Sequence, residues 1–544
     1  MTFADLQKEI TGLVAKNEAS VAPYLSCAKS LGTIQGEVPS YVRTIRTAFV
    51  SSFTIQGLAE VCQAQGIFHN LLAETYMAPY NQFSQEILAF KSGLYAFRPD
   101  VVYCMIDAPD VMDDAHLQSL VSTLLERTDA RIVIFNFTEG KKIDRAAAGA
   151  LNEGLGSLSS NNARVIIFDF ASFLDSIGRS EYWYTKYTDM GDLRLAPSAF
   201  PALAKRMLAF AVAASGNTKK CVVLDLDNTL WRGIVGEDGP MGIVPDKKIQ
   251  EYLVDLFEKG IILAINSKNN SEDALEAIES NPAMALKKKN FAAWRINWDS
   301  KEKNMAELAE ELNLGTDSFV FVDDDPFQRE LITDAFPEIA VLPPERLVGY
   351  GGFHSFVLTQ EDKRRGVMYV EERMRKELQK SLRTEEDFLK ELALRVEVSD
   401  VSQETIARIS QLTQKTNQFN VTTRRYSEQD IQTCLAHGWK IWAISVADRF
   451  GDYGVVGVIM VEPKRNVWRV DNFLLSCRVL GRRVEDYLVE HLLKAARHEG
   501  VIKIEAMYIS SAKNQQTKNF WDTMAFVLVS EDGKEKQYRY EFTS

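Results

Sequence analysis

Two aspartates follow an apolar run in the middle of the chain. Residues 221–226 are predicted to form a strand, and Asp225 and Asp227 stand two residues apart at its carboxyl end. Because side chains alternate along a strand, both carboxylates face the same side and can share a hard cation. One carboxylate can attack phosphorus while the other protonates the leaving oxygen. The pair indicates phosphoryl chemistry, although exposed carboxylate pairs are common and this one alone is a weak signal.

Further polar residues stand at the ends of neighbouring predicted elements. Ser267 directly follows the apolar run 262–266, where its hydroxyl can donate to a phosphoryl oxygen, and Lys301 can neutralise phosphoryl charge. Asp323 and Asp324 follow the run 319–322 and add carboxylates for the cation. Ligands of open α/β sheets bind outside the carboxyl ends of the strands. We therefore expect these residues to meet at one edge of a sheet.

The order D-x-D-x-T, Ser, Lys and Asp-Asp resembles the signature of the haloacid dehalogenase (HAD) superfamily. The resemblance implies a Mg²⁺-dependent enzyme that forms an aspartyl-phosphate. It implies that Asp225 is the nucleophile and that Asp227 is the general acid/base, with its backbone carbonyl also on the metal. Asp324 most closely matches the third metal ligand, and Asp323 matches it less closely.

The same resemblance implies that Thr229, Ser267 and Lys301 hold the phosphoryl group. The segment 231–261, between the first motif and the next strand, is too short for a large cap domain. We therefore expect a HAD-like Rossmannoid domain with a minimal cap, whose site is open to a bulky partner.

Seven longer phrases stand at residues 226–239, 267–270, 297–298, 321–327, 416–420, 448–452 and 476–482. They resemble the FkbH-like proteins of polyketide and related pathways, and the resemblance extends from about residue 46 to residue 526. That family takes a glyceryl unit from 1,3-bisphosphoglycerate, removes phosphate, and leaves a glyceryl thioester on the phosphopantetheine of an acyl carrier protein. The resemblance implies this acyl phosphate donor and this phosphopantetheinylated carrier as partners.

An acyl transfer to a carrier thiol could use a nucleophile of the enzyme, and Cys477 is the candidate. It lies just past the predicted strand 470–475, where a turn could hold the thiol at a helix N-terminus and lower its pKa. A single cysteine is more often a small buried apolar residue. The family phrase around Cys477 brings the catalytic and the packing interpretations to about equal weight.

The C-terminal part also resembles the GNAT acyltransferase fold, in which Arg/Gln-x-x-Gly-x-Gly/Ala binds the pyrophosphate of coenzyme A. Arg478 and Gly481 match the first two elements and are candidate binding residues, whereas Arg483 replaces the last small residue. The replacement makes ordinary acetyl-CoA chemistry less favoured and leaves room for a phosphopantetheine arm. Residues that could line this site, or equally serve as structural polar groups, are Asn417, Arg449, Asp452, Lys513 and Asn514.

The N-terminal part alternates apolar runs with helical patterns, which predicts a parallel sheet covered on both faces. Ser51 and Ser52 follow the first run in a phrase similar to the nucleophile turn of SGNH hydrolases. Those enzymes need a late histidine, but no histidine occurs between His116 and His354, and His69 and His116 come too early. We therefore predict an SGNH-like α/β domain without catalytic activity.

The length of 544 residues predicts several domains. The predicted fold class is an α/β multidomain protein. Its parts are an SGNH-like domain over 1–215, a HAD-like domain over 216–360, a connecting helix over 361–392, and a GNAT-like α+β domain over 393–544.

Charge and composition limit which partners and which cellular location are expected. A net charge of −12 repels phosphate backbones and anionic lipid, so neither nucleic acid nor a membrane is expected as a partner. The first residues lack a secretion signal, and the six cysteines form no C-x-x-C pair. A cytoplasmic enzyme with reduced thiols is predicted.

Two other functions are compatible with the sequence. One is a HAD phosphatase fused to a GNAT-type acyltransferase that modifies another small acceptor; the departure at Arg483 and the phrase around Cys477 count against it. The other is a scaffold without catalysis that binds carrier proteins. The presence of Asp225, Asp227 and Lys301 counts against a scaffold, since a pseudoenzyme need not retain them all.

Overall fold

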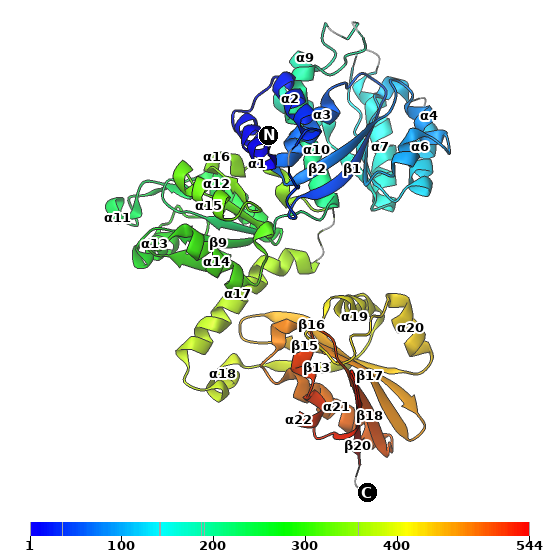
Figure 1. The fold of residues 1–544 in the computed structure, drawn as a ribbon, viewed down its shortest axis with the longest axis vertical. Helices are drawn as coiled ribbons and strands as arrows, with labels where there is room; N and C mark the ends of the chain where they lie inside the picture. Colours follow the sequence, from blue (N-terminus) through cyan, green and yellow to red (C-terminus); the bar gives the residue numbers. More distant parts are fainter. Residues whose placement is uncertain are drawn as a thin grey trace. The chain divides into compact units, whose positions relative to one another are not determined.

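The computed structural model describes residues 2–34, 36–111, 113–140, 143–186, 188–189, 191–356, 358 and 360–542, with residues 360 and 361 described by their backbone alone. The chain forms two compact units, Met1–Val370 and Glu371–Ser544 (Figure 1). The first unit holds two parallel sheets and the second one mixed sheet. This confirms the predicted α/β multidomain class. Of the described helices, none is long and apolar enough to cross a bilayer.

The first sheet is parallel throughout, with strand order β2-β1-β3-β4-β5. Apolar clusters cover it on both faces, one built with α3 and α10 and the other with α6 and α7. The strands are β1 (Arg43–Ser51), β2 (Leu71–Met77), β3 (Val101–Met105), β4 (Arg131–Phe135) and β5 (Val165–Phe168). The helices are α1 (Phe3–Ala15), α2 (Val21–Leu31), α3 (Leu58–Phe68), α4 (Phe83–Leu88), α5 (Gly93–Phe97), α6 (Asp114–Arg127), α7 (Arg145–Asn161), α8 (Phe170–Ile177), α9 (Arg179–Tyr182) and α10 (Phe200–Ala214).

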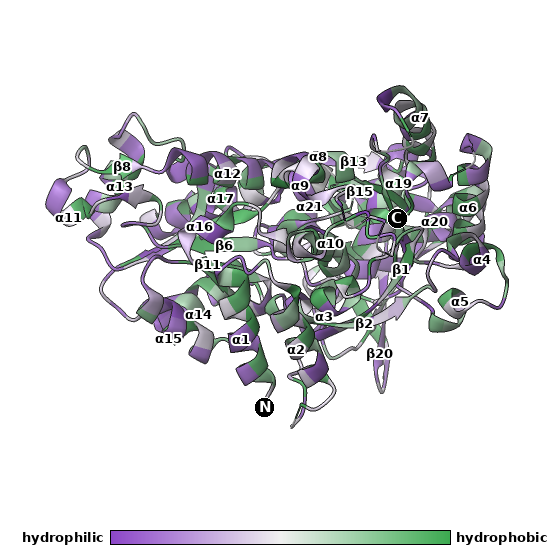
Figure 2. Cartoon of the chain, turned by 90° about the horizontal axis from the view of Figure 1, so that it is seen from above, coloured by the Kyte–Doolittle hydropathy of each residue, from purple (hydrophilic) through white to green (hydrophobic). Residues whose placement is uncertain are grey.

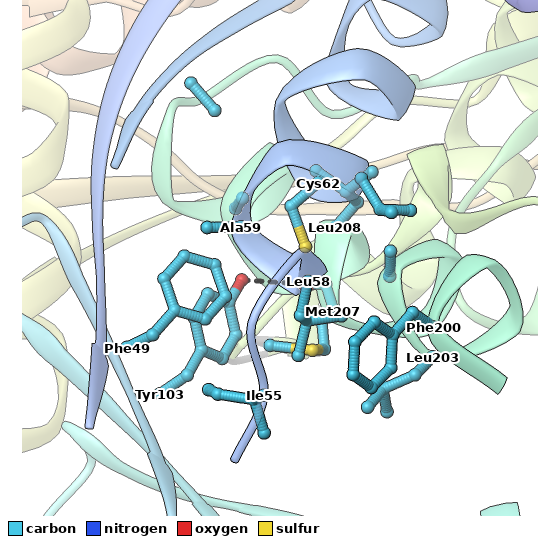
Figure 3. Close-up of a cluster of buried hydrophobic side chains, with 14 of the residues drawn as sticks. Phe49, Ile55, Leu58, Ala59, Cys62, Tyr103, Phe200, Leu203, Met207 and Leu208 are labelled. Atoms are coloured by element: carbon cyan, nitrogen blue, oxygen red, sulfur yellow. Dashed lines mark hydrogen bonds between the residues drawn. The ribbon is translucent and has the colours of Figure 1, made fainter. Parts of the chain in front are cut away.

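The core on one face of this sheet fixes α10 in place. Phe49 of β1 and Tyr103 of β3 are buried against α3 and α10 (Figure 3). The Tyr103 hydroxyl donates a hydrogen bond of 2.8 Å to the backbone carbonyl of Met207 on α10. Leu203 and Leu208 of α10 are also buried in this cluster. With one side of α10 anchored here, the positions of the side chains on its other side are set.

The second sheet is also parallel throughout, with order β10-β9-β6-β11-β12. The strands β9, β6 and β11 are neighbours, so their carboxyl ends lie side by side. The strands are β6 (Cys221–Leu224), β9 (Ile262–Ser267), β10 (Phe291–Ile296), β11 (Phe319–Val322) and β12 (Ala340–Leu342). The helices are α12 (Lys247–Glu258), α13 (Ser271–Ser280), α14 (Lys301–Leu312), α15 (Pro326–Ala335) and α16 (Pro344–Leu347).

A small insert occupies the segment after β6 in which the sequence left room for only a small cap. It consists of the two-residue strands β7 (Trp231–Arg232) and β8 (Val244–Pro245) around the single turn of α11 (Val235–Asp238). Figure 2 shows α11, like α15, coloured mainly hydrophilic, as expected for elements that face water. The prediction of a minimal cap is confirmed.

The second unit is built on an eight-stranded mixed sheet in which only β17 and β18 pair in parallel. The helix α21 packs on one face, and α19 and α20 cover the other. The strands are β13 (Arg395–Asp400), β14 (Phe419–Asn420), β15 (Lys440–Ala447), β16 (Asp452–Lys464), β17 (Val467–Leu475), β18 (Lys503–Ile509), β19 (Val527–Asp532) and β20 (Glu535–Glu541). The helices are α19 (Gln403–Lys415), α20 (Glu428–Ala436), α21 (Val484–His498) and α22 (Phe520–Thr523).

The segment predicted as one connecting helix forms two helices, α17 (Gln360–Ser381) and α18 (Glu385–Leu392). The break lies at 382–384, where the Thr384 hydroxyl accepts a hydrogen bond from the Asp387 amide and caps α18. Within the second unit, Arg375 of α17 is buried and forms a two-pronged ion pair with Asp448, at 2.6 and 3.0 Å. The C-terminal part of α17 is therefore docked on the mixed sheet and is not merely a solvated spacer.

We expect Arg375→Met to lower the free energy of unfolding of the second unit by about 3–5 kcal/mol, because it leaves a buried carboxylate without its partner. Asp448 is fully buried and also accepts a hydrogen bond of 2.7 Å from the Tyr453 hydroxyl. Hydrogen exchange of β15 and β16 in urea measures the change. The control Lys380→Met removes an exposed cation from the same helix and should have almost no effect. Equal protection in both variants would contradict the docking role.

Candidate functional site

A turn after β6 presents the two predicted aspartates. The Asp225 amide donates to the Val322 carbonyl at 2.9 Å, which continues the β6–β11 ladder one residue past the strand. Asn228 then adopts a left-handed conformation, with φ of 53°, that asparagine tolerates better than most residues. The Thr229 amide closes the turn onto the Leu226 carbonyl at 3.1 Å. Asp225 is therefore held rigidly at the carboxyl edge of the sheet and is nearly buried.

Lys301 lies between two of the carboxylates. Its Nζ is 2.6 Å from Asp323 Oδ2 and 3.0 Å from Asp225 Oδ1, and all three side chains are buried. The Asn266 side chain donates to the Lys301 carbonyl at 2.8 Å, which fixes the first residue of α14 against β9. Burial lowers the pKa of Lys301, but Asp225 and Asp323 outweigh it and hold the pKa above its ordinary value. Lys301 is thus a permanent cation beside Asp225.

Asp225 has a raised pKa, chiefly because burial disfavours its charged form. The proximity of Lys301 opposes this effect, the proximity of Asp323 adds to it, and a hydrogen bond from Ser267 favours the ionised carboxylate. The carboxylate is therefore poorly hydrated but paired. This environment suits a nucleophile that must be ionised and unscreened by water.

Three carboxylates fit a cation. Asp225, Asp323 and Asp324 each offer an oxygen within 4.8 Å of the others, an oxygen-rich set of the kind that Mg²⁺ prefers. Asp323 uses Oδ2 for Lys301 and accepts the Asp325 amide on Oδ1 at 2.8 Å. Asp324 is exposed, and its pKa is raised by burial of its inner part and by the charge of Asp225. A cation between Asp225 and Asp324 would relieve that repulsion.

Asp227 stands apart from this trio. Its Oδ1 accepts hydrogen bonds from Trp231 Nε1 at 2.8 Å and from the Val235 amide at 3.1 Å, and its Oδ2 accepts from Asn269 Nδ2 at 3.0 Å. The small insert therefore aims the Asp227 carboxylate. A metal contact of Asp227 through its backbone carbonyl, as the HAD resemblance implies, is compatible with this orientation.

The predicted phosphoryl-holding residues reach the same edge. Ser267 ends β9, where it is buried next to Asp225, and Lys301 begins α14. The Thr229 hydroxyl accepts a hydrogen bond from the Asp324 amide at 3.1 Å, which ties the β6 turn to the end of β11. The structure thus brings the seven predicted residues of this domain together, from four separate stretches of the chain.

Asn269 is a site residue that the sequence did not single out. Its Nδ2 lies 3.0 Å from Asp227 Oδ2 and 3.2 Å from Ser267 Oγ, so it bridges the predicted acid/base and a phosphoryl-holding hydroxyl. The only signal in the sequence was its place in the phrase 267–270.

We expect Asn269→Ala to slow phosphate release by about 10- to 100-fold, because Asp227 loses one of the three hydrogen bonds that orient its carboxylate. Steady-state kinetics with a phosphate monoester measures the loss. Asn270→Ala is the matched control, since the neighbouring Asn270 side chain donates outward to Asp273 at 2.9 Å. Equal rates for the two variants would show that Asn269 does not position Asp227.

In the second unit, Cys477 lies on an exposed turn. The short 3-10 helix η6 (Cys477–Val479) follows β17, and α21 begins only at Val484. Cys477 therefore begins a single 3-10 turn and does not lie at the N-terminus of α21, because Gly481 and Arg483, both with positive φ, turn the chain between η6 and α21. Cys477 is nevertheless the one exposed cysteine of the six, all of which lie in the described part of the chain.

The residues around Cys477 have separate roles. Arg478 donates from Nε to the Ser476 hydroxyl at 3.3 Å on the same turn. Arg482 is buried, where it contacts the Tyr453 hydroxyl and binds Glu372 Oε2 at 3.0 Å. This turn is thus pinned to α17 through Arg482 and leaves Cys477 facing solvent.

Of the five further residues named for this site, Asn514 is structural. It is fully buried and donates to the carbonyls of Asn420 and Ile509, each at 2.9 Å. Arg449 pairs with Glu391 at 3.2 Å. Asn417 accepts a hydrogen bond from Arg425, Asp452 accepts one from the Gly454 amide at 2.7 Å, and Lys513 is exposed.

The serines of the N-terminal part are used in local packing. Ser51 Oγ donates to the Phe53 carbonyl at 2.8 Å, and Ser52 Oγ accepts the Asp107 amide at 3.0 Å. His116 lies on α6 near Ser84, and His69, just after α3, stacks on Tyr350. Burial lowers the pKa of His69 to about 3. Neither of these two histidine contacts involves Ser51 or Ser52.

Comparison with known proteins finds no matching family model and no matching curated protein. Among solved structures, the N-terminal part of the protein BF1531 from Bacteroides fragilis, described as containing a phosphatase domain complexed with Mg, matches with TM-score 0.52 and 26% identity. The match covers 66% of this chain and 100% of that one. The chain described here is an enzyme. This likeness and the carboxylate trio confirm the predicted enzyme and its Mg²⁺ cofactor.

Acetyltransferase structures match a smaller part of the chain. Ard1 from Thermoplasma volcanium and a putative GNAT-family acetyltransferase from Desulfovibrio desulfuricans each have 14% identity and TM-score 0.23. Each match covers 27% of this chain and 99% of the acetyltransferase. At these scores the chemistry of the second unit has to be argued from its own residues.

Proposed function

We propose that the enzyme transfers a glyceryl unit from 1,3-bisphosphoglycerate, with dephosphorylation, to the phosphopantetheine thiol of an acyl carrier protein. The observation that carries the proposal is the rigid, buried pairing of Asp225 with Lys301 beside Asp324, in a domain with a minimal cap. The FkbH-like phrases support the donor and the acceptor, and the exposed thiol of Cys477 supports acyl transfer.

The chain's own residues account for the removal of phosphate. Asp225 attacks phosphorus, the bond from phosphorus to the substrate oxygen breaks, and Asp227 gives a proton to that leaving oxygen. Water then attacks the aspartyl-phosphate while Asp227 takes its proton, which releases phosphate and restores Asp225. Lys301 stays charged throughout and neutralises the phosphoryl oxygens. Mg²⁺, held by Asp225, Asp324 and the Asp227 carbonyl, would supply further positive charge for the same oxygens.

The acyl half of the reaction needs a thiol. A thiolate attacks the carbonyl carbon of the acyl phosphate, the bond from carbon to the phosphate oxygen breaks, and phosphate leaves with the electron pair. The product is a thioester, which a carrier thiol can accept by exchange. Cys477 is proposed as the first thiol, because it is the exposed cysteine of this chain and lies on a turn fixed by Arg482.

The proposal is tested by incubating the full-length enzyme with Mg²⁺, 1,3-bisphosphoglycerate and a phosphopantetheinylated carrier protein. Intact mass spectrometry should show the carrier heavier by one glyceryl group without phosphate. A carrier protein that lacks the phosphopantetheine arm is the control and should stay unchanged. Carrier that remains unloaded with every acyl phosphate tried, by an enzyme that still releases phosphate from small esters, would refute the carrier acceptor but not the phosphatase site.

A further inference from the structure

Two aromatic residues are exposed at the carboxyl edge of the second sheet, where the phosphatase residues lie. Trp298 follows β10 and Phe327 lies in the first turn of α15, and they are 75% and 60% exposed. Over residues 216–356, all of which the structure describes, the exposed large apolar side chains all belong to the segments that follow β6, β10 and β11. They are Ile234, Met241, Val244, Trp298 and Phe327. Apolar exposure in this part of the chain is therefore confined to segments that start at the carboxyl edge, and is not scattered over the surface.

We name Trp298 and Phe327 the aromatic pair, and the backbone that carries both residues is held by hydrogen bonds. The Asn297 amide donates to the Ser267 carbonyl at 3.1 Å, which continues the pairing of β10 with β9 up to the residue before Trp298. The Phe327 amide donates to Asp325 Oδ1 at 2.9 Å, which fixes the first turn of α15. Both residues are therefore presented on ordered backbone before any ligand binds, and this lowers the entropy cost of binding.

The aromatic pair lies on the two sides of the nucleophile. The strand order β10-β9-β6-β11 places the segment of Trp298 two strands from β6 and the segment of Phe327 one strand from it. Neighbouring strands are about 4.8 Å apart, so the two segments start about 10 Å and about 5 Å from the end of β6. Asp225 directly follows β6, between the two segments. A molecule bound at Asp225 that extends along the edge in either direction therefore reaches the segment of one of the two rings.

The part of a substrate that extends along this edge is its leaving group. Asp225 is paired with the buried Lys301, which also pairs with the buried Asp323, whereas Asp324 is exposed. The attacking and leaving oxygens stand roughly in line in phosphoryl transfer, so the leaving group points away from Asp225 and away from the sheet. The rest of the substrate must then pass the segments that follow β6, β10 and β11.

We propose that Trp298 and Phe327 select phosphate esters whose leaving group carries an apolar or aromatic portion. The inference rests on the phosphatase half of the proposed function, and it concerns the ester cleaved at Asp225, not the acyl phosphate that the thiol attacks. Exposed aromatic rings gain from covering such a portion, because each ring buries a large area and makes favourable ring contacts. A short polar leaving group ends before it reaches either segment. Trp298 and Phe327 are thus specificity-determining residues, and the groups around Asp225 act on phosphorus.

Two alkyl phosphates test the proposal with the full-length enzyme and Mg²⁺. Ethyl phosphate ends short of the aromatic pair, whereas 4-phenylbutyl phosphate carries a ring on a flexible chain, and both release an ordinary alcohol. The kcat/KM of wild type should be at least about tenfold higher for 4-phenylbutyl phosphate than for ethyl phosphate. Trp298→Ala and Phe327→Ala should each lower this ratio by about 3- to 10-fold, mainly through KM, as expected for the loss of one aromatic contact.

Phe90→Ala is the matched control. Phe90 is 77% exposed and lies between α4 and α5, beside the first sheet, so this variant should keep the wild-type ratio. Trp298→Phe keeps a ring and should retain most of the ratio that Trp298→Ala loses. Inhibition by 4-phenylbutylphosphonate, which the enzyme cannot hydrolyse, measures binding without the chemical step. Its inhibition constant should rise in Trp298→Ala in the same proportion as KM.

Several results would overturn the selection of apolar esters. Equal kcat/KM of wild type for the two esters would do so and would leave the rings to a protein surface. A ratio that Trp298→Ala and Phe327→Ala leave unchanged, or that Phe90→Ala lowers as much, would also do so. Activity lost in equal proportion toward both esters would show that the two side chains only support their segments. Failure of wild type to hydrolyse either ester would refute the phosphatase centre itself, and the inference with it.

Discussion

Asp225→Asn should abolish phosphate release, with kcat lowered by at least about 10³-fold, since loss of acid/base groups alone costs about 10²- to 10⁴-fold. An amide oxygen cannot displace the leaving group and form an aspartyl-phosphate, and it binds a cation more weakly than a carboxylate. The fold should survive, because Lys301 keeps its contact of 2.6 Å with Asp323 when it loses the one of 3.0 Å with Asp225. Phosphate release with Mg²⁺ present measures the effect.

Asp299→Asn is the matched control for this experiment. Asp299 lies near the same edge but is half-exposed and pairs with Lys303 on the surface. It should release phosphate at the wild-type rate. A phosphoryl adduct trapped on Asp225 of wild type, detected by rapid-quench peptide mass spectrometry, would directly support Asp225 as the nucleophile. Substantial phosphate release by purified Asp225→Asn, with contaminating phosphatases excluded, would show that Asp225 is not the nucleophile.

The phosphatase half of the molecule could be predicted from sequence because few physical rules decide it. Strands buried on both faces, such as β6 and β11, are continuous apolar runs, and such runs are easy to recognise in a sequence. Parallel strands also bring their carboxyl ends to one edge, so Asp225, Ser267 and Asp324 had to be neighbours once the sheet formed. The spacing of the polar residues after the apolar runs was therefore enough to predict which residues lie together in the site, without knowledge of any contact between them.

The finer geometry depended on contacts that no local pattern encodes. The aim of Asp227 is set by Trp231 Nε1 and the Val235 amide, which the insert brings back to the turn. The role of Asn269 depends on this orientation of the Asp227 carboxylate, and it could not be predicted before that orientation was known. A cavity lined by α10 and α12 is likewise formed by two helices far apart in the sequence, whose mutual approach depends on how the two sheets pack within the first unit.

The turn at Cys477 shows a different limit. Arg483 takes a left-handed conformation, with φ of 58°, which an arginine rarely adopts and which no propensity scale would assign to it. Tertiary contacts stabilise this turn, because the neighbouring Arg482 is buried against Tyr453 and Glu372. The strand and helix on either side were predictable, whereas the connection that decides how the thiol is presented was not.

Cys477→Ala should lower carrier loading by at least about 10²-fold while phosphate release from simple monoesters continues at the wild-type rate. Only the acyl half of the proposed reaction needs this thiol, and Cys477 belongs to the second unit whereas Asp225 belongs to the first. Among the other five cysteines, burial raises the pKa of each, to about 11 for Cys27 and about 12 for Cys104, which makes them poor nucleophiles near neutral pH. Intact mass of the carrier measures loading.

Cys434→Ala is the appropriate control, because Cys434 is the next most accessible thiol and lies on α20 of the same unit. It should load the carrier normally. Peptide mass spectrometry after reaction with donor but without carrier should reveal a glyceryl adduct on Cys477 of wild type and of Cys434→Ala. If Cys477→Ala loads the carrier as fast as wild type, the carrier thiol attacks the acyl phosphate directly. The exposed thiol on the turn after β17 then takes no part in the reaction, and the phosphopantetheine arm itself must reach the donor.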